Sequence, residues 1–269
     1  MHERHSRVRI SQEYNMRTII IGDIHGCSGA LRLLLAKIMP NPKEDKLILL
    51  GDLFDRGPDS WGVFQMVREL EEAFGDRFVF LRGNHEDYLL QRQLTLPQRI
   101  VWERVGRGTT VKSFRAHGAK MEDSADWIRE HVVFYYRGEG FQCVHAGLKI
   151  DPIEANDYYT MIHDHGVVME NVYAGPLTIV GHIALEKPTW FPGAGQPVKV
   201  LAESTGQPVK APGGSRLPEA QELQNVPELQ ELPEKGVICI DTGCGKGGRL
   251  TGMVIKDGKF YLLSAGEEG

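Results

Sequence analysis

Short apolar runs alternate with amphipathic segments over the first third of the chain. Three runs, at 17–23, 45–52 and 77–85, are rich in aliphatic and β-branched residues and end at a glycine followed by a polar residue. This pattern is typical of buried strands. The segments between them, 28–39 and 59–75, have apolar residues at helical spacing,. Strands that alternate with helices predict parallel β-α-β crossovers, and therefore an α/β fold.

The pattern changes after this region. The segment 86–131 is expected to be helical, with Trp102, Phe114 and Trp127 as core anchors,. Beyond Gly138 the apolar runs have short or irregular connections and predict strands, which lie within 141–147, 177–182, 236–243, 249–256 and 259–265,. The Asp257-Gly258 pair between the last two runs is typical of a β-hairpin turn.

A proline-punctuated segment interrupts the later strands. Eight of the fourteen prolines lie between Pro188 and Pro233, and the sequence GQPVK occurs at both 195–199 and 206–210. We expect an insert at about 188–235 that is a mobile surface excursion rather than an ordered lid. The predicted organisation is a polar N-terminal extension, 1–16, followed by a single domain, 17–263, that carries this insert.

Composition excludes several classes of protein. The net charge is −5 and the pI is about 6.1, so nothing suggests a partner that is a nucleic-acid polymer. The apolar runs are too short to cross a membrane, and residues 1–16 lack the apolar core of a secretory signal. The four cysteines have no metal-knuckle spacing,. We therefore expect a cytoplasmic protein with reduced thiols.

Polar residues follow the ends of five predicted strands. Each of these ends has a glycine turn next to Asp, Asn or His, and the residues concerned are Asp23, His25, Asp52, Asn84, His145 and His182. Ligand sites in open α/β sheets lie outside the carboxyl ends of the strands. These side chains are therefore expected to converge in space although they are scattered along the sequence.

Asp and His side chains together suit divalent transition metals, with Mn expected first and Fe or Zn as alternatives. The residues suffice for two ions: Asp23, His25 and Asp52 for one, and Asp52, Asn84, His145 and His182 for the other. A bridging Asp52 would hold the ions roughly 3.5–4 Å apart, and such a pair makes hydroxide from water at neutral pH. Phosphate ester hydrolysis requires this chemistry.

The blocks Gly-Asp-x-His-Gly, Gly-Asp-x-x-Asp-Arg-Gly and Gly-Asn-His-Glu occur here in that order, beginning at Gly22, Gly51 and Gly83. Together they resemble the phosphoprotein-phosphatase branch of the calcineurin-like metallophosphoesterases. The segments VHAGL, VGH and IDTGCGKGGRLTGM resemble later blocks of its bacterial members, the serine/threonine phosphatases and symmetrical diadenosine tetraphosphatases. This resemblance implies two mixed β-sheets in a sandwich flanked by α-helices, with a dinuclear metal centre.

The resemblance also implies roles for individual residues. The six residues at the strand ends would be metal ligands, and Asn84 would also contact the substrate phosphate. His85 would protonate the leaving oxygen while Asp55 orients it, since a carboxylate favours the protonated imidazole that a general acid requires. Arg56 would hold the phosphate oxygens with its planar guanidinium group. Glu86 is expected to cap the following helix, and Asp241 to lie in a structural turn.

One position departs from the resemblance. Relatives carry a second phosphate-binding arginine after the His-Ala-Gly block, whereas this chain has His163 in the corresponding stretch. A permanent bidentate cation would thereby become a titratable single donor. His163 or His165 would then contact phosphate, or another cation would replace the arginine. The candidates for that replacement are Arg82, Arg104, Arg107 and Lys187.

Three functions follow from these expectations. The first is a serine/threonine protein phosphatase that acts on a phosphorylated protein, or on a small phosphoester, through a metal-bridging hydroxide. The alternative is a symmetrical diadenosine tetraphosphate hydrolase. The third is a weakly active or non-catalytic phosphate or metal binder, which the loss of an arginine at His163 would permit. The segment between Gly147 and Gly181 is only about 30 residues long, shorter than in the tetraphosphatases, and this favours the first function.

Overall fold

Two β-sheets form the centre of the protein in a computed structural model that describes residues 16–204 and 228–266. The first sheet has seven strands in the order β10-β13-β12-β1-β2-β3-β4. Their bounds are β1 Thr18–Ile21, β2 Lys46–Leu49, β3 Phe78–Leu81, β4 Val132–Val133, β10 Gln230–Glu231, β12 Leu250–Lys256 and β13 Lys259–Ala265. Strands β1 to β4 are parallel, whereas β12 pairs antiparallel with both β1 and β13.

The second sheet has six strands in the order β5-β6-β7-β11-β8-β9. Their bounds are β5 Tyr135–Arg137, β6 Gln142–Val144, β7 Thr178–Val180, β8 Thr189–Phe191, β9 Lys199–Val200 and β11 Val237–Cys239. Strand β7 pairs parallel with β6 and β11, and the remaining pairs are antiparallel. Both sheets are therefore mixed, as the resemblance implied.

Alternate residues of the strands fill different cores. Ile19 and Ile21 of β1 pack with the helices outside the first sheet. Ile20, between them, packs with Ile179 and Ile238 of the second sheet. This is the period of two expected for a strand that is buried on both faces. A third core lies on the other face of the second sheet, so the protein is an α/β/β/α sandwich, and the predicted fold class is confirmed.

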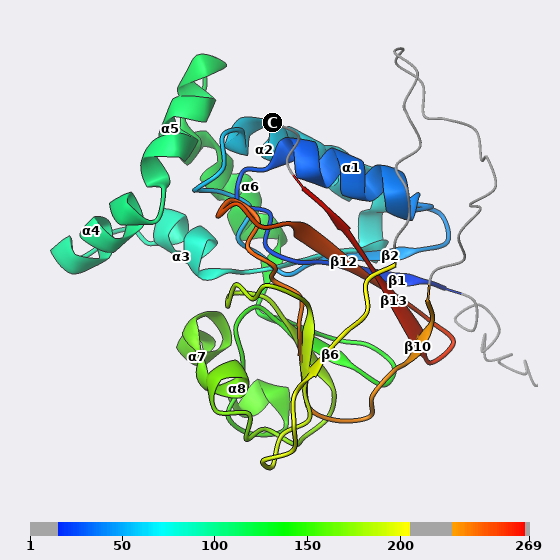
Figure 1. Ribbon diagram of the computed structural model, residues 1–269. Coiled ribbons are helices and arrows are strands. Elements are labelled where there is room, and N and C mark those ends of the chain that lie inside the picture. The colour runs from blue at the N-terminus through cyan, green and yellow to red at the C-terminus, as the bar shows by residue number, and fades with distance from the viewer. Residues whose placement is uncertain (1–15, 205–227, 267–269) are drawn as a thin grey trace, which may run out of the picture.

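Helices cover both outer faces. Figure 1 shows α1 and α2 on one side of the first sheet, and α7 and α8 beside the second sheet. The helices are α1 Ser28–Ile38, α2 Ser60–Phe74, α3 Asn84–Leu90, α4 Leu96–Arg104, α5 Arg107–Ala116, α6 Ala125–His131, α7 Tyr158–His163 and α8 Gly166–Met169. Short 3-10 turns are η1 Gly75–Arg77, η2 Met121–Ser124 and η3 Ile153–Ala155.

Several local expectations are confirmed. Asp59 caps α2 by accepting a hydrogen bond from the Gly62 amide. Trp102 and Phe114 are buried in the helical segment, whereas Trp127 is only partly buried. The hairpin between β12 and β13 turns through Asp257 and Gly258, both of which have positive φ.

The N-terminal extension and most of the proline-rich insert fall on residues 1–15 and 205–227, outside the described part of the chain. At the start of the predicted insert, Thr189–Phe191 forms β8, which pairs with β11 inside the second sheet. At its other end, β10 pairs with the edge strand β13. No helix within 16–204 and 228–266 is long and apolar enough to cross a membrane.

Candidate dinuclear metal site

The loops that follow five strands bring the predicted site residues together. The loop after β1 carries Asp23 and His25, and the loop after β2 carries Asp52, Asp55 and Arg56. Strand β3 leads to Asn84 and His85 in the first turn of α3, β6 leads to His145, and β7 leads to His182. All of these side chains are buried except those of Arg56 and His182, which are partly buried. The convergence predicted from the strand ends is therefore observed.

The backbone of these loops adopts an unusual conformation. His25, Asp52, Asp55, Arg56 and His182 all have φ between 48° and 70°. Residues other than glycine rarely adopt this left-handed region, and its energetic cost is often found at functional sites. The clustering of five such residues in these loops indicates that the positions of their side chains are constrained.

Asp52 lies at the centre of the site. Two clusters of potential metal-binding side chains occur in the described residues, His25-Asp52-His85 and Asp52-His145-His182, and Asp52 belongs to both. Its Oδ2 lies 3.6 Å from Nε2 of His25, and its Oδ1 lies 3.5 Å from Nε2 of His145. One carboxylate thus directs an oxygen toward each cluster, an arrangement that suits a residue shared by two metal sites.

Two of the imidazoles are oriented by main-chain carbonyl groups. Nδ1 of His25 lies 2.8 Å from the Phe54 oxygen, and Nδ1 of His145 lies 2.8 Å from the Leu50 oxygen. A carbonyl oxygen only accepts, so Nδ1 carries the proton in both rings. Burial lowers the pKa of both histidines, which leaves an Nε2 lone pair directed at Asp52,. Metal-binding histidines are commonly held in this way.

Lone pairs also converge in the second cluster. The Oδ1 atom of Asn84 lies 3.1 Å from Nε2 of His145 and 3.0 Å from Nδ1 of His182. Burial lowers the pKa of His182 to about 3, and its buried Nε2 has no hydrogen-bond partner. Neutral nitrogen and oxygen donors that point at one another are the donor set of a divalent transition metal. The residues present therefore fit a metal in this cluster.

Asp23 is placed differently from its predicted partners. It belongs to neither cluster, and its Oδ2 accepts a hydrogen bond of 2.9 Å from the His182 amide. Its Oδ1 is buried without a partner. Burial and the charges of Asp241 and Asp52 raise the pKa of Asp23, and burial raises the pKa of Asp241 to about 6. A cation near these carboxylates would offset both effects.

Asp55 and His85 form a tightly held pair. Oδ2 of Asp55 lies 2.6 Å from Nδ1 of His85 and accepts a hydrogen bond of 2.7 Å from Nε1 of Trp102. Thr110 donates to Oδ1 of Asp55 at 2.7 Å and accepts from the Asp55 amide at 2.8 Å. Burial lowers the pKa of His85, but the Asp52 charge and the Asp55 hydrogen bond outweigh it and raise the pKa overall. Helices α4 and α5 therefore fix the predicted acid through Asp55.

The Trp102 hydrogen bond gives a testable prediction for hydrolysis of a phosphoserine peptide, whose leaving group needs a general acid,. Trp102→Phe keeps the ring stack but removes the donor to Asp55. We expect kcat to fall about 10- to 100-fold, since a hydrogen bond to a charged group contributes roughly 1.5–3 kcal/mol, while KM changes little. The partly buried Trp127 packs on the same core. A matched Trp127→Phe control with the same fall in kcat would contradict a positioning role for Trp102.

Glu86 has a larger role than the predicted helix cap. Its carboxylate accepts from the amide of Gly83, as a cap does, but also from the amides of Asp52 and Leu53 at 2.8 Å. Burial and the neighbouring Asp52 charge raise the pKa of Glu86 to about 7. The side chain thus ties the loop of the central carboxylate to the start of α3, and the cap prediction is extended rather than overturned.

The predicted phosphate-binding residues lie at the edge of the site. Nη2 of Arg56 lies 3.3 Å from Nε2 of His85, and the buried Nε of Arg56 has no partner. The His163 ring packs 4.4 Å from the Tyr159 ring, and its centroid is 6.5 Å from that of His182. The His165 ring is nearer, at 4.7 Å from His182. Both histidines that could replace the missing arginine are therefore next to the second cluster.

Two of the other candidate cations already have partners. Arg82 pairs with Asp87 and lies over the Phe134 ring. Arg107 pairs with Glu103 at 2.6 Å and lies over the Trp102 ring. The structure shows no contact of Arg104 or Lys187 with the site in the described residues.

Comparisons with known proteins agree with this geometry. A family model for calcineurin-like phosphoesterases matches residues 16–205. A symmetrical bis(5'-nucleosyl)-tetraphosphatase of Pseudomonas fluorescens (strain SBW25) is 31% identical over 134 residues, which are 49% of this chain and 44% of the relative. Its counterpart in Erwinia tasmaniensis is 34% identical over 136 residues, 49% of this chain and 45% of the relative. The matches span less than half of each relative.

A likeness in fold extends to another kind of phosphatase. The solved structure of a protein serine/threonine phosphatase from Saccharomyces cerevisiae superposes with a TM-score of 0.51 at 12% identity, covering 96% of this chain and 82% of that one. At this identity the likeness concerns the fold alone. Architecture therefore does not distinguish a phosphoprotein substrate from a dinucleotide.

Proposed function

The chain belongs to the calcineurin-like phosphoesterase family, and from that premise we propose that it is a metal-dependent hydrolase that cleaves dinucleoside polyphosphates symmetrically. The choice of a dinucleotide as substrate rests on the names of the two curated relatives. The short segment after His145 favoured a protein phosphatase over a dinucleotide hydrolase. The proposal reverses this ranking of the two functions. The short segment remains the observation that favours a phosphoprotein as the second candidate substrate.

Two divalent ions are proposed to complete the site. His25, Asp52 and Asp23 would hold one, and Asp52, Asn84, His145 and His182 the other. Asp23 is included because its buried, unpartnered Oδ1 needs a cation, although it lies outside both observed clusters. Mn is proposed first from the mixed oxygen and nitrogen donors, with Fe or Zn as alternatives. When bound, such a pair supplies an activated water and neutralises charge on the phosphate.

The remaining residues would act on the substrate directly. His85 would donate the proton on Nε2 to the leaving phosphate oxygen, while Asp55 holds Nδ1 and stabilises the imidazolium,. Arg56 would bind phosphate oxygens through its guanidinium group, which lies beside Nε2 of His85,. Asn84 would contact both ion and phosphate, and His163 or His165 would offer a further donor at the edge of the site.

A side-by-side assay with Mn tests the proposal. The substrates are diadenosine tetraphosphate, a phosphoserine peptide and p-nitrophenyl phosphate. We expect the highest kcat/KM for the dinucleotide, with ADP as the only nucleotide product, because symmetrical cleavage yields two equal halves. Faster turnover of the phosphopeptide would reverse the ranking of the two substrates.

Metal dependence is tested in the same assay. Dialysis against a chelator should abolish hydrolysis, and Mn should restore it. Full activity of the metal-free protein would contradict the mechanism. Tight Mn binding without turnover of any of the three substrates would instead leave the chain as a non-catalytic binder, in line with the loss of an arginine at His163.

A further inference from the structure

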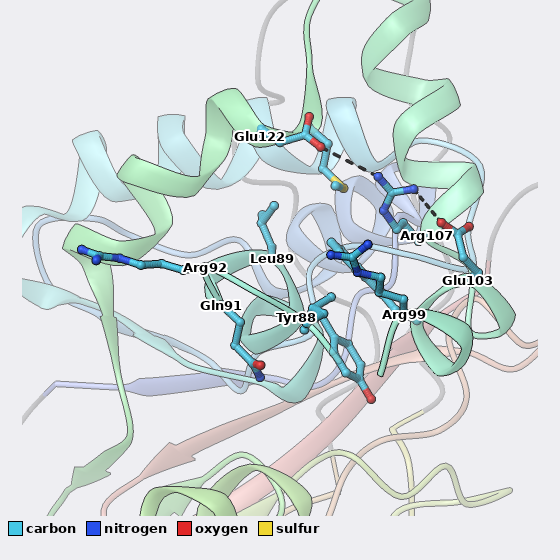
Figure 2. Close-up of a pocket in the computed structure, with 11 residues that line it drawn as sticks. Tyr88, Leu89, Gln91, Arg92, Arg99, Glu103, Arg107 and Glu122 are labelled. Carbon is cyan, nitrogen blue, oxygen red and sulfur yellow. Dashed lines mark hydrogen bonds and ion pairs between the residues drawn. The ribbon is translucent and has the colours of Figure 1, made fainter. Parts of the chain in front are cut away.

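We propose that a pocket next to the candidate metal site, lined by α3, α4, α5 and η2, binds the leaving nucleotide half of the dinucleotide. This inference rests on the proposed function and on the role of His85, and it assigns a substrate position that neither the motifs nor the comparisons indicate. The pocket has a volume of about 400 Å³. Figure 2 shows the side chains that line it.

The pocket adjoins the predicted general acid. Tyr88 lies one turn after His85 on α3, and the centroids of the two rings are 6.1 Å apart. The Trp102 ring stacks on Tyr88 and donates its hydrogen bond to Asp55, the residue that holds His85. Two members of the pocket wall are therefore in direct contact with the Asp55-His85 pair.

The position of the acid determines which half of the substrate would lie there. A general acid must be within hydrogen-bond reach of the leaving oxygen. The group attached to that oxygen therefore extends on the His85 side of the phosphate that is attacked. In symmetrical cleavage this group is a nucleoside diphosphate, for which the pocket lined by Tyr88 is the proposed place.

The charges of the lining suit an anion. Arg107 pairs with Glu103 at 2.6 Å and approaches Glu122 at 3.9 Å, so one arginine contacts both acidic residues of the lining. Arg92 and Arg99 are exposed and have no ion pair within the described chain. Figure 2 draws Arg92 at one end of the pocket, and Arg99 with Arg107 at the other. The three arginines outnumber the two glutamates, so the lining offers a net positive charge of one to the diphosphate.

The uncharged part of the lining suits a nucleoside. Leu89 and Leu94 are partly buried, Met121 is buried, and Tyr88 presents a half-buried aromatic ring. Binding sites for small molecules typically combine such apolar walls with a few polar groups in a volume of about 300–1,000 Å³. Trp102 itself is not available for stacking on a base, because Tyr88 covers one face and Arg107 lies over the ring.

The test compares two substrates in the double variant Arg92→Gln/Arg99→Gln with Mn present. We expect the ratio of kcat/KM for diadenosine tetraphosphate to that for p-nitrophenyl phosphate to fall about tenfold, as lost charge-assisted hydrogen bonds imply. The nitrophenyl ester lacks a nucleotide leaving group, so it reports the metal site alone. Arg32→Gln, on the exposed face of α1, makes the same type of substitution outside the pocket, with the loss of one positive charge, and should leave the ratio unchanged.

Product inhibition gives a second measurement that does not depend on turnover of the dinucleotide. With p-nitrophenyl phosphate as substrate, the inhibition constant of ADP should rise about tenfold in the double variant, while that of inorganic phosphate stays the same. An unchanged ADP constant, an equal rise for phosphate, or a selective loss of phosphopeptide hydrolysis would overturn the pocket assignment. If the wild-type protein does not hydrolyse the dinucleotide but is inhibited by ADP through Arg92 and Arg99, the proposed substrate is refuted. The assignment of the pocket to a nucleotide is then retained.

Discussion

His85→Asn should lose about 10²–10⁴-fold in kcat toward a phosphoserine peptide, whose alcohol is a poor leaving group, the range that a positioned general acid supplies. The loss should be much smaller for p-nitrophenyl phosphate, whose leaving group needs little protonation. The structural reason is the single orientation of the ring: Nδ1 is held by Asp55 at 2.6 Å, so only Nε2 is directed toward the substrate. The measurement is kcat for both substrates at saturating Mn.

Metal content distinguishes this role from the other role that the geometry allows. Nε2 of His85 lies 3.8 Å from Oδ2 of Asp52, and His85 belongs to one of the two clusters of potential ligands. As an acid, His85 can be replaced without loss of metal, so the variant should retain two Mn ions per chain. Empty sites in His85→Asn would make the residue a ligand. His117→Asn, at an exposed histidine at the end of α5, serves as the matched control.

The convergence of the polar residues at the strand ends could be predicted from the sequence for a physical reason. Each residue proposed as a metal ligand follows a strand within one or two positions of a glycine, and the fold places the ends of those strands together. His145 and His182 are far from Asp52 along the chain, yet Nε2 of His145 lies 3.5 Å from Oδ1 of Asp52. The position of these residues at strand ends therefore predicted that they lie close together, which their residue types alone did not.

The supporting residues were harder to foresee. Trp102 and Thr110 lie in helical patterns whose apolar spacing indicates only burial, and a hydrogen bond to a residue about 50 positions away leaves no local signal. Glu86 has a local signal for a helix cap, because glutamate occurs three residues after Gly83. Its bonds to Asp52 and Leu53 depend on how the second and third strands are juxtaposed, which the cap pattern does not encode.

Asp52→Asn should remove both metal ions and with them nearly all hydrolysis. Asp52 is the one residue shared by the two ligand clusters, with one oxygen toward each. Removing one partner from a buried charged group costs about 3–5 kcal/mol, which corresponds to roughly 10²–10⁴-fold in metal affinity. Asparagine is the informative replacement because it tolerates the positive φ of 53° at this position,. The folded structure should therefore survive.

Metal analysis and activity decide the prediction together. Calorimetric titration should show both Mn affinities weakened in Asp52→Asn, whereas a terminal ligand such as His182 would weaken one. Asp59→Asn is the matched control, because Asp59 belongs to the same loop but caps α2 through the Gly62 amide. Its replacement should lower stability slightly and leave both ions in place. One fully retained Mn site in Asp52→Asn would show that Asp52 is a terminal ligand, and the carboxylate that joins two ions would then have to be another residue.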